Sequence, residues 1–395
     1  MKNIFVTFVI LFFSQFSEAY YVKIAKDNHI VQPGYITTLA EPNIQATAIT
    51  SDSTKLFSIF RPSDNYCLSV TKVSYSINNT GSTTSCFGNQ YVVGNKVNKI
   101  ILDNFGKTFY ILSNYNIVAY NISPITDRIK GQIFRKRFIQ KIVDAKLVDE
   151  GKYLYLLTAS DKSQKGKLII YRVNTDGSLD ELNITVLRYK PKKIVFNSIE
   201  SVYIQSNKSI YFYSFLRNGK VIKNEKIITI PSGEISDFSV ITESSTESKV
   251  LLVGHSGNEG FEIGFVNTYN FSSGMVRQTN NRVYKDLPLK IVTYKDKFSG
   301  QSKILVAFKS KLINGTDESV KLLGDEYKVN GNFVGLLQNN NLVEVVYSSS
   351  VVVYDLKESR LLSNLFLNKT SDSSLFLSNK FIGVGSQSNI NIFQL

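Results

Sequence analysis

The sequence contains few of the residues that build metal and redox sites. Its 395 residues include two histidines, two cysteines, two methionines and no tryptophan. A structural zinc site takes four ligands, mostly Cys and His, so His29, His255, Cys67 and Cys86 would all have to converge on one ion. We therefore expect neither a metal site nor another bound cofactor.

Long apolar runs are also missing. The longest, residues 4–13, is about half of the roughly twenty residues that a membrane-spanning helix needs. Because this run follows Lys2 and ends shortly before the small residue Ala19, it has the pattern of a secretory signal peptide. We expect residues 1–19 to be the signal peptide and residues 20–395 to form one secreted, extracellular domain with no transmembrane segment.

Acidic residues are outnumbered by basic ones. Lys and Arg total 46 against 32 Asp and Glu, which gives a formal net charge of +14. Such an excess favours anionic partners, among them acidic glycans, membrane surfaces and other polyanions. The alternative interpretation is that the excess of basic residues only keeps the protein soluble. Nucleic acid is not an expected partner, because the chain is secreted and carries no recognisable nucleic-acid-binding module.

The two cysteines lie about nineteen residues apart in the first quarter of the chain. Since the secretory route is oxidising, we expect a Cys67–Cys86 disulfide, which contributes roughly 3 kcal/mol to stability if it is unstrained. A secreted chain also meets the N-glycosylation machinery, which modifies Asn-X-Ser/Thr in exposed loops. Such sequons occur at Asn78, Asn121, Asn183, Asn207, Asn270, Asn314 and Asn368.

Helical periodicity over eleven or more residues is absent, whereas short runs of Val, Ile, Leu, Tyr and Phe bounded by Gly, Asn, Asp and Ser recur along the chain. These runs predict an all-β protein. They fall into units of four short strands, with second strands about 46 residues apart. We count eight units, which begin near residues 44, 97, 141, 192, 235, 289, 332 and 374.

The last unit has three strands, which indicates that the chain closes on itself. An N-terminal strand, either "YYVKI" at residues 20–24 or "YITTL" at residues 35–39, can supply the missing outer strand. This overlap is typical of a β-propeller, a ring of four-stranded blades. We predict a single propeller of eight blades, with seven as the alternative because the third strand of the sixth unit is hard to place. A β-sandwich, or two stacked β-domains, is the competing architecture.

One unit also resembles a known family. The stretches "DEGKYLYLL" (149–157) and "GKLIIYRVNTDGSLDEL" (166–182) resemble a blade of the lactonase-type, or 6-phosphogluconolactonase-like, β-propellers. That superfamily includes hydrolases and non-enzymatic relatives, so the resemblance implies the propeller fold and leaves hydrolysis as an alternative activity. Propellers built from tryptophan-aspartate repeats are not expected, because the chain has no tryptophan.

The acids of this pattern have a structural explanation. Asp103 with Gly106, and Asp149 with Gly151, lie between the first and second strands of their units. A tight turn there needs an Asx side chain and a residue that tolerates positive φ. We therefore interpret these acids as turn formers and not as a catalytic carboxylate set.

No organised nucleophile, base and orienting group is recognisable in the connections between second and third strands, which are small and polar. His255, with Glu259 or Glu262 nearby, is a candidate acid/base pair, and an ordinary loop histidine is the simpler interpretation. A lactonase-like mechanism would need a central pocket that joins carboxylates, an arginine and His255, or a divalent cation held by loop oxygens.

The chain carries two dense basic clusters near the ends of adjacent units. If both meet at one surface, they form an electropositive patch with salt-sensitive affinity for anionic polysaccharide. Solvated outer-strand lysines that prevent edge-to-edge aggregation are the alternative. The candidate ligand-binding residues are Arg135, Lys136, Arg137 and Lys141 in one cluster, and Arg188, Lys190, Lys192 and Lys193 in the other.

These observations predict a secreted, glycosylated β-propeller that acts as a non-enzymatic binding or adhesion module for an anionic glycan or an extracellular protein partner. The alternative is a lactonase-like hydrolase with a central-pocket active site, and a structural extracellular protein is a third. The sequence leaves the ligand and the oligomeric state open.

Overall fold

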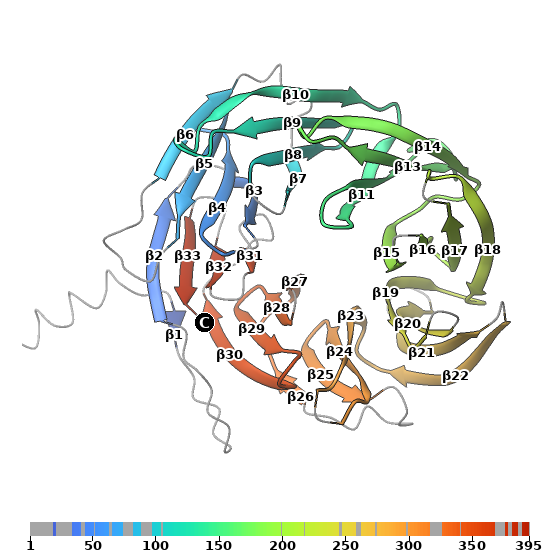
Figure 1. Cartoon of the computed structure of the whole chain (residues 1–395). Helices are drawn as coiled ribbons and strands as arrows, with labels where there is room; N and C mark the ends of the chain where they lie inside the picture. The colour runs from blue at the N-terminus through green and yellow to red at the C-terminus, as the bar shows by residue number, and fades with distance from the viewer. Residues whose placement is uncertain are drawn as a thin grey trace, which may run out of the picture.

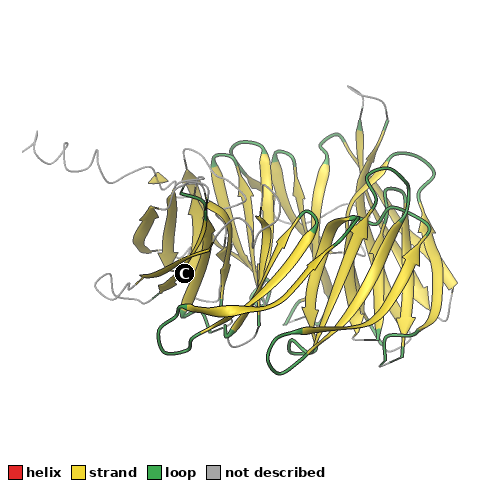
Figure 2. Ribbon diagram, turned by 90° about the horizontal axis from the view of Figure 1, so that it is seen from above, coloured by secondary structure: helices red, strands yellow, loops and turns green. Residues whose placement is uncertain are grey.

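In a computed structural model, the chain forms a ring of antiparallel sheets around a central axis (Figure 1). Seen from a second direction, the strands run between two faces at which the loops gather (Figure 2). The structure describes residues 19–20, 34–40, 44–50, 52–62, 65–73, 82–87, 97–103, 106–198, 200–216, 218–244, 247–257, 262–272, 275–297, 299–316, 326–339, 341–367, 376–377, 381–385 and 389–394. Within them the strands form eight sheets, seven of four strands and one of five. The predicted all-β propeller and its count of eight blades are confirmed.

The first four blades follow one another along the chain, each with its first strand nearest the axis (Figure 1). Blade 1 contains β3 (Ile44–Ile49), β4 (Lys55–Phe60), β5 (Tyr66–Lys72) and β6 (Ser82–Phe87). Blade 2 contains β7 (Val97–Leu102), β8 (Thr108–Ser113), β9 (Asn116–Ile122) and β10 (Ile129–Arg137). Blade 3 contains β11 (Lys141–Val148), β12 (Tyr153–Ala159), β13 (Gly166–Val173) and β14 (Leu179–Leu187). Blade 4 contains β15 (Lys193–Ser198), β16 (Ser201–Gln205), β17 (Ser209–Phe215) and β18 (Val221–Thr229).

The remaining blades complete the ring. Blade 5 contains β19 (Glu234–Thr242), β20 (Glu247–Ser256), β21 (Ile263–Ser272) and β22 (Met275–Tyr284). Blade 6 contains β23 (Pro288–Lys295), β24 (Ser302–Phe308), β25 (Lys311–Thr316) and β26 (Glu326–Lys328). Blade 7 contains β27 (Phe333–Asn339), β28 (Leu342–Tyr347), β29 (Ser350–Asp355), β30 (Arg360–Leu367) and, at its edge, β1 (Ala19–Tyr20). Blade 8 contains β31 (Phe376–Leu377), β32 (Phe381–Gly385), β33 (Asn389–Gln394) and β2 (Gly34–Ala40).

The ring closes by pairing the two ends of the chain, as predicted. β2 is the outer strand of blade 8, where Leu39 pairs with Ile390, so "YITTL" supplies the missing strand. The other candidate begins at Tyr20, which instead pairs with Phe366 at the edge of blade 7. The predicted signal peptide lies outside the described residues, except for Ala19.

The sixth unit is a complete blade. Its third strand, β25, reads "KLINGT", and the apolar run ends at Asn314 and Gly315. Leu312 of this strand pairs with Tyr327 of the short outer strand β26. This strand pairs with β24 along its length, but its sequence has no alternation of apolar and polar residues. The sequence pattern alone therefore does not reveal it.

The hydrophobic core lies between the blades. In β8, Phe109 and Ile111 pack with residues of blade 1, whereas Tyr110 and Leu112 pack with residues of blade 3. All four side chains are buried. Since neighbouring blades cover both faces of the sheet, its inner strands read as continuous apolar runs instead of alternating ones.

The predicted turn formers shape turns. The backbone N–H of Lys107 donates to the Asp103 carboxylate at 2.8 Å, and Gly106 has a φ of +63°. In the family-like stretch, Asp149 and Gly151 have φ angles of +52° and +92°, and the Asp149 carboxylate pairs with Lys152 at 3.3 Å. The Asp176 carboxylate accepts the Ser178 backbone N–H at 2.8 Å. All three carboxylates therefore have partners within their own turns, which agrees with a structural role.

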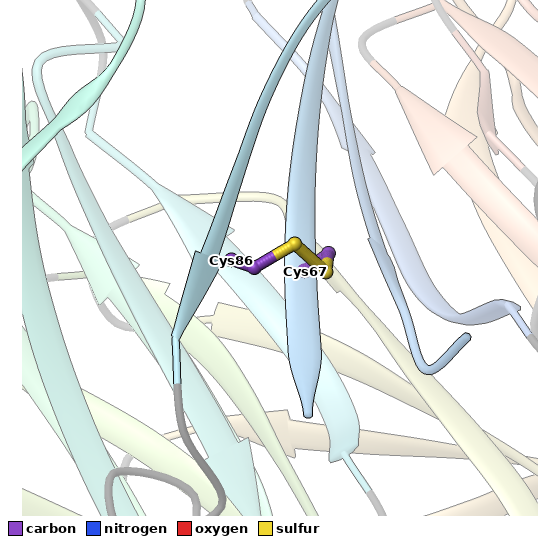
Figure 3. The surroundings of a disulfide bond; sticks show 2 residues. All are labelled: Cys67 and Cys86. Atoms are coloured by element: carbon purple, nitrogen blue, oxygen red, sulfur yellow. A yellow bond between two sulfur atoms is a disulfide. The ribbon is translucent and has the colours of Figure 1, made fainter. Parts of the chain in front are cut away.

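The predicted disulfide is present in blade 1. Cys67 of β5 and Cys86 of β6 are directly paired across the ladder, and their Cα atoms are 4.0 Å apart (Figure 3). Cys67 is buried. The bond joins the outer strand of this blade to its third strand covalently.

Glu344 is a buried carboxyl at the interface of blades 7 and 8. It lies in β28 between Leu342 and Val346, which pack with Leu377 of blade 8. Alternate residues of a strand share a face, so Glu344 points in the same direction. Its side chain is fully buried, and neither carboxyl oxygen has a hydrogen-bond partner among the described residues. Burial raises the pKa of this group well above its ordinary value of 4.5.

Replacing Glu344 by Gln should remove a pH dependence of stability. Between the ordinary and the raised pKa, the folded protein binds more protons than the unfolded chain, so its free energy of unfolding falls as the pH rises. Glu344→Gln stays neutral at every pH. In guanidinium unfolding we expect similar stabilities at pH 4 and an advantage of ~1 kcal/mol or more for the variant at pH 8. A difference that is the same at both pH values would contradict this expectation.

Candidate functional site

Two kinds of connection define two faces of the ring. The loops between second and third strands and the links between consecutive blades, such as residues 160–165 and 188–192, form what we call the junction face. The turns between first and second strands and between third and fourth strands, such as residues 149–152 and 174–178, form the turn face. Ligands of a propeller can approach either face, because loops carry the side chains that a rigid scaffold presents.

Three segments of the junction face are in contact on blades 2 to 4. The Thr158 hydroxyl, near the end of β12, donates to the Gln140 side chain at 2.8 Å, which places the loop 160–165 beside the preceding blade link. On the other side of this loop, Gly166 approaches Pro191 so closely that a Cβ would lie 2.3 Å from the proline ring. The loop is therefore held between two consecutive blade links.

These three segments carry a group of cations that we call the basic rim. The side chains of the rim have no ion pair or hydrogen bond with a described residue, and each is exposed or half-buried. One acid, Asp161, lies in the same loop, and its carboxylate accepts the Tyr115 hydroxyl at 2.6 Å. The rim consists of Lys141, Lys162, Lys165, Arg188 and Lys190.

Three of the eight predicted binding cations have other partners. Lys136 pairs with Glu181 of β14 and lies 5.4 Å from the centre of the Tyr171 ring. Lys192 pairs with Glu234 at 3.2 Å. Lys193 lies beside the axis, as described below. These lysines join neighbouring blades, so their charges are neutralised within the fold.

Arg135 and Arg137 are exposed on the outer strand β10. They alternate with Lys136, which points toward blade 3, so they point to the other face of the strand. The structure thus brings Lys141, Arg188 and Lys190 to one rim. It leaves Arg135 and Arg137 on the outer wall.

The inner strands of blades 2 to 6 carry a series of alternating charges near the axis. What we call the Lys–Asp ring takes one residue from the same position of five successive inner strands: Lys99, Asp144, Lys193, Asp237 and Lys290. In four of these strands the residue follows a β-bulge, which bends the strand locally. The corresponding residues of blades 1 and 7 are Ala46 and Gly335.

Each aspartate of the ring links three blades in the same way. Asp144 lies 3.8 Å from the amine of Lys99 and accepts the Ile194 backbone N–H at 3.1 Å. Asp237 lies 2.5 Å from the ring lysine of blade 4 and accepts the Ile291 backbone N–H at 3.2 Å. Both lysines also donate to the backbone carbonyl next to the aspartate, at 3.0 Å in each case. The arrangement therefore repeats every two blades.

Lys146 adds a further cation beside the ring. It lies two residues after Asp144 on β11 and makes no hydrogen bond or ion pair with a described residue. Burial lowers the pKa of its amine, and the charges of Lys193 and Lys99 lower it further, against the opposing effect of Asp144. The inner part of the described ring thus holds more positive than negative charge.

The candidate acid/base pair is partly assembled. His255 Nε2 lies 3.6 Å from a Glu262 oxygen, whereas Glu259 lies outside the described residues. Glu234 faces His255 across the ladder but directs its carboxylate to Lys192 and Asn207. No hydrogen bond or ion pair of the described chain joins His255 to an arginine. The cluster that a lactonase-like mechanism needs is not formed by these residues.

No group of three or more His, Cys, Asp or Glu side chains in the part of the chain that the structure describes is arranged to hold a metal ion. The same part contains no helix that is long and apolar enough to cross a membrane.

Sequence reasoning missed the Lys–Asp ring and two members of the basic rim, Lys162 and Lys165. The ring does have a sequence signal, because the inner strands of alternate blades share a pattern. Blades 2, 4 and 6 contain "VNKII" (97–101), "PKKIV" (191–195) and "PLKIV" (288–292), and blades 3 and 5 contain "IVDA" (142–145) and "ISDF" (235–238). Comparing units two apart, instead of adjacent ones, would reveal it.

The sequence matches no protein-family model and no curated protein. In structure, the chain is similar to Sqt1 from Chaetomium thermophilum, with a TM-score of 0.64 and 8% identity over 92% of this chain and 100% of that one. It is also similar to the computationally designed protein Ika8, with a TM-score of 0.59 and 9% identity over 92% and 100% of the two chains. A protein from Lactobacillus plantarum has 13% identity over 83% of this chain and 86% of that one, at a TM-score of 0.46.

At these identities the similarity concerns the fold alone. The chain is therefore a β-propeller.

Removing a ring carboxylate should destabilise the protein strongly. The Asp237 side chain is 2% exposed, and Asp237→Ala removes the carboxylate that pairs with the Lys193 amine and leaves the Ile291 backbone N–H without its acceptor. We expect a loss of roughly 3–5 kcal/mol in the free energy of unfolding, as for other broken buried pairs. Asp180→Ala is the matched control, because Asp180 pairs with Arg172 in the open, with side chains 51% and 58% exposed. Its expected loss is about 0–1 kcal/mol, and equal losses in urea unfolding would contradict a special role for the ring.

Proposed function

We propose that this chain is a secreted, non-enzymatic binding module whose basic rim binds an anionic glycan. The observation that carries the proposal is the convergence of three segments from blades 2 to 4, which brings to one face five cations that pair with no carboxylate of the described residues. The sulfates and carboxylates of an extended glycan are spaced along a chain. Several cations along one rim can therefore bind them at the same time.

Two features favour a polyanion over a single small anion. The rim side chains project from loops and blade links at the surface, so each charge contributes weakly and affinity depends on the sum. The excess of positive charge over the whole chain, formally +14, would speed the approach of such a polymer. An acidic protein surface offers the same charges, and the experiment below distinguishes it.

The experiment compares two charge-matched triple variants on immobilised heparin. Lys162→Gln, Lys165→Gln and Arg188→Gln remove three rim charges. We expect this variant to elute at lower salt, with the slope of log affinity against log salt reduced by about two to three, since each lost contact removes close to one counterion. The control changes Lys130, Lys220 and Lys226 to Gln, all exposed residues away from the rim. It should elute like the natural protein.

Two results would count against the rim. Equal losses in the two variants would mean that net charge alone drives the attraction. Elution of the natural protein below about 0.3 M salt would mean that the attraction is generic. Retention of an acidic protein by the natural chain with no retention on heparin would favour a protein partner instead.

Secretion makes a second prediction, on the glycosylation of the chain itself. A glycan needs an accessible asparagine amide. Asn207 and Asn270 are exposed, whereas Asn314 is 8% exposed and its side-chain oxygen accepts the Tyr294 hydroxyl at 2.8 Å. Asn78 and Asn368 lie outside the described residues.

We expect glycans on Asn207 and Asn270 and none on Asn314 when the full chain is secreted from a eukaryotic host. Glycopeptide mass spectrometry of the medium checks this directly. Asn207→Gln and Asn270→Gln should each reduce the mass by one glycan, and Asn314→Gln should leave the glycan mass unchanged. Retention of the whole chain inside the cell would contradict the predicted secretion, and a glycan on Asn314 would contradict its burial.

A further inference from the structure

Among the described residues, two cavities open on the turn face, one on each side of the turn between β15 and β16. The larger, about 410 Å³, lies between blades 3 and 4, and the Asp149–Lys152 ion pair, at 3.3 Å, contributes to its lining. The smaller, about 280 Å³, lies between blades 4 and 5. We call the smaller one the serine cavity. The pairing of the strands shows which side chains line its walls.

Serine side chains line one wall of the serine cavity. Ser198 of β15 pairs with Ser201 of β16, which pairs with Ser214 of β17. Residues that pair directly across a ladder point to the same face, so three hydroxyls form a row on blade 4. Ser248 of blade 5 lines the cavity from the opposite side.

Aromatic rings form the adjoining row. Tyr203 pairs directly with Phe212 in the next register of the same sheet, and their ring centres are 5.2 Å apart. Phe271 of blade 5 lies 5.3 Å from Phe212 and 6.3 Å from Tyr203. The cavity thus combines a hydroxyl-bearing edge with an apolar aromatic edge, which is the usual composition of a small-ligand site.

Several polar groups of the cavity retain unused hydrogen-bonding capacity. The Ser198 and Ser201 hydroxyls bond to each other at 2.9 Å, while the Ser214 hydroxyl has no partner among the described residues. The Tyr203 side chain is fully buried, and its hydroxyl lies beside Ser248 without a well-formed hydrogen bond to a described residue. Buried polar groups without partners are uncommon and indicate a missing ligand or water.

We propose that the serine cavity binds one residue of a neutral sugar. Hydroxyls of a sugar ring both donate and accept hydrogen bonds, as serine hydroxyls do, and the C–H face of the ring is apolar enough to contact aromatic side chains. The volume equals that of roughly nine waters, at ~30 Å³ each, which suits one six-membered ring. Glu200 is the one charged side chain among the described lining residues, so nothing there favours an anion. This site is separate from the basic rim, on the opposite face.

The test uses saturation-transfer NMR on the full chain with glucose, galactose, mannose and N-acetylglucosamine as probes. We expect at least one of them to bind, with a Kd on the order of 1 mM. Ser214→Leu fills the cavity and should abolish the signal. Ser214→Ala removes one hydrogen bond and should weaken binding about 2- to 10-fold. Ser232→Leu makes the same change at an exposed serine of the junction face and should have no effect.

Absence of binding by all four sugars would overturn the proposal, and so would equal binding by the Ser214→Leu and Ser232→Leu variants. If Ser214→Leu does not fold, the graded loss in Ser214→Ala decides. The rim triple variant separates this site from the proposed function. It should keep sugar binding while it loses heparin affinity, and a loss of both would mean that the sugars bind at the rim and not in the serine cavity.

Discussion

Covering both apolar faces of every blade is the constraint on which the structure depends. A four-stranded sheet such as blade 2 sends Phe109 to one neighbour and Tyr110 to the other, so an isolated blade would expose two hydrophobic surfaces. An open row of blades would still expose one at each end. Closing the row into a ring removes both ends. The hydrogen bonds between β2 and β33 fasten this closure, because they join the N-terminal and C-terminal segments in one sheet.

Near the axis the blades are close together, and polar contacts there fix how they meet. The Lys–Asp ring uses the carboxylate twice, once for a lysine of the preceding blade and once for a backbone N–H of the following blade. A shift of one residue would flip each side chain to the other face and would break both contacts. The ring therefore favours one relative position of neighbouring blades, while apolar packing supplies most of the stability. Blades 1 and 7, with Ala46 and Gly335 at this position, rely on apolar contacts near the closure.

The sequence predicts local structure well because turns and apolar runs are local. It predicted the eight units, two candidate strands for their closure, the disulfide and the structural role of the turn acids. It could not show that Lys136 and Lys193 are neutralised, because their partners Glu181 and Asp237 lie 45 and 44 residues away. For the same reason it counted them as binding residues. Lys162 and Lys165 join the rim only through contacts such as Gly166 with Pro191, which the strand pattern does not reveal.

Both proposed sites lie where two blades meet, and the fold explains why. Within a blade, side chains of the sheet are covered by the neighbouring blades, whereas the loops and links at the ends of the strands leave side chains uncovered. On the junction face the contacting segments carry lysine and arginine, which remain in water without cost. On the turn face the seam between blades 4 and 5 ends in serines and aromatic rings, which form a concave and nearly uncharged site. A rigid ring holds these surfaces on opposite faces, so an anionic polymer on one leaves the other open to a sugar.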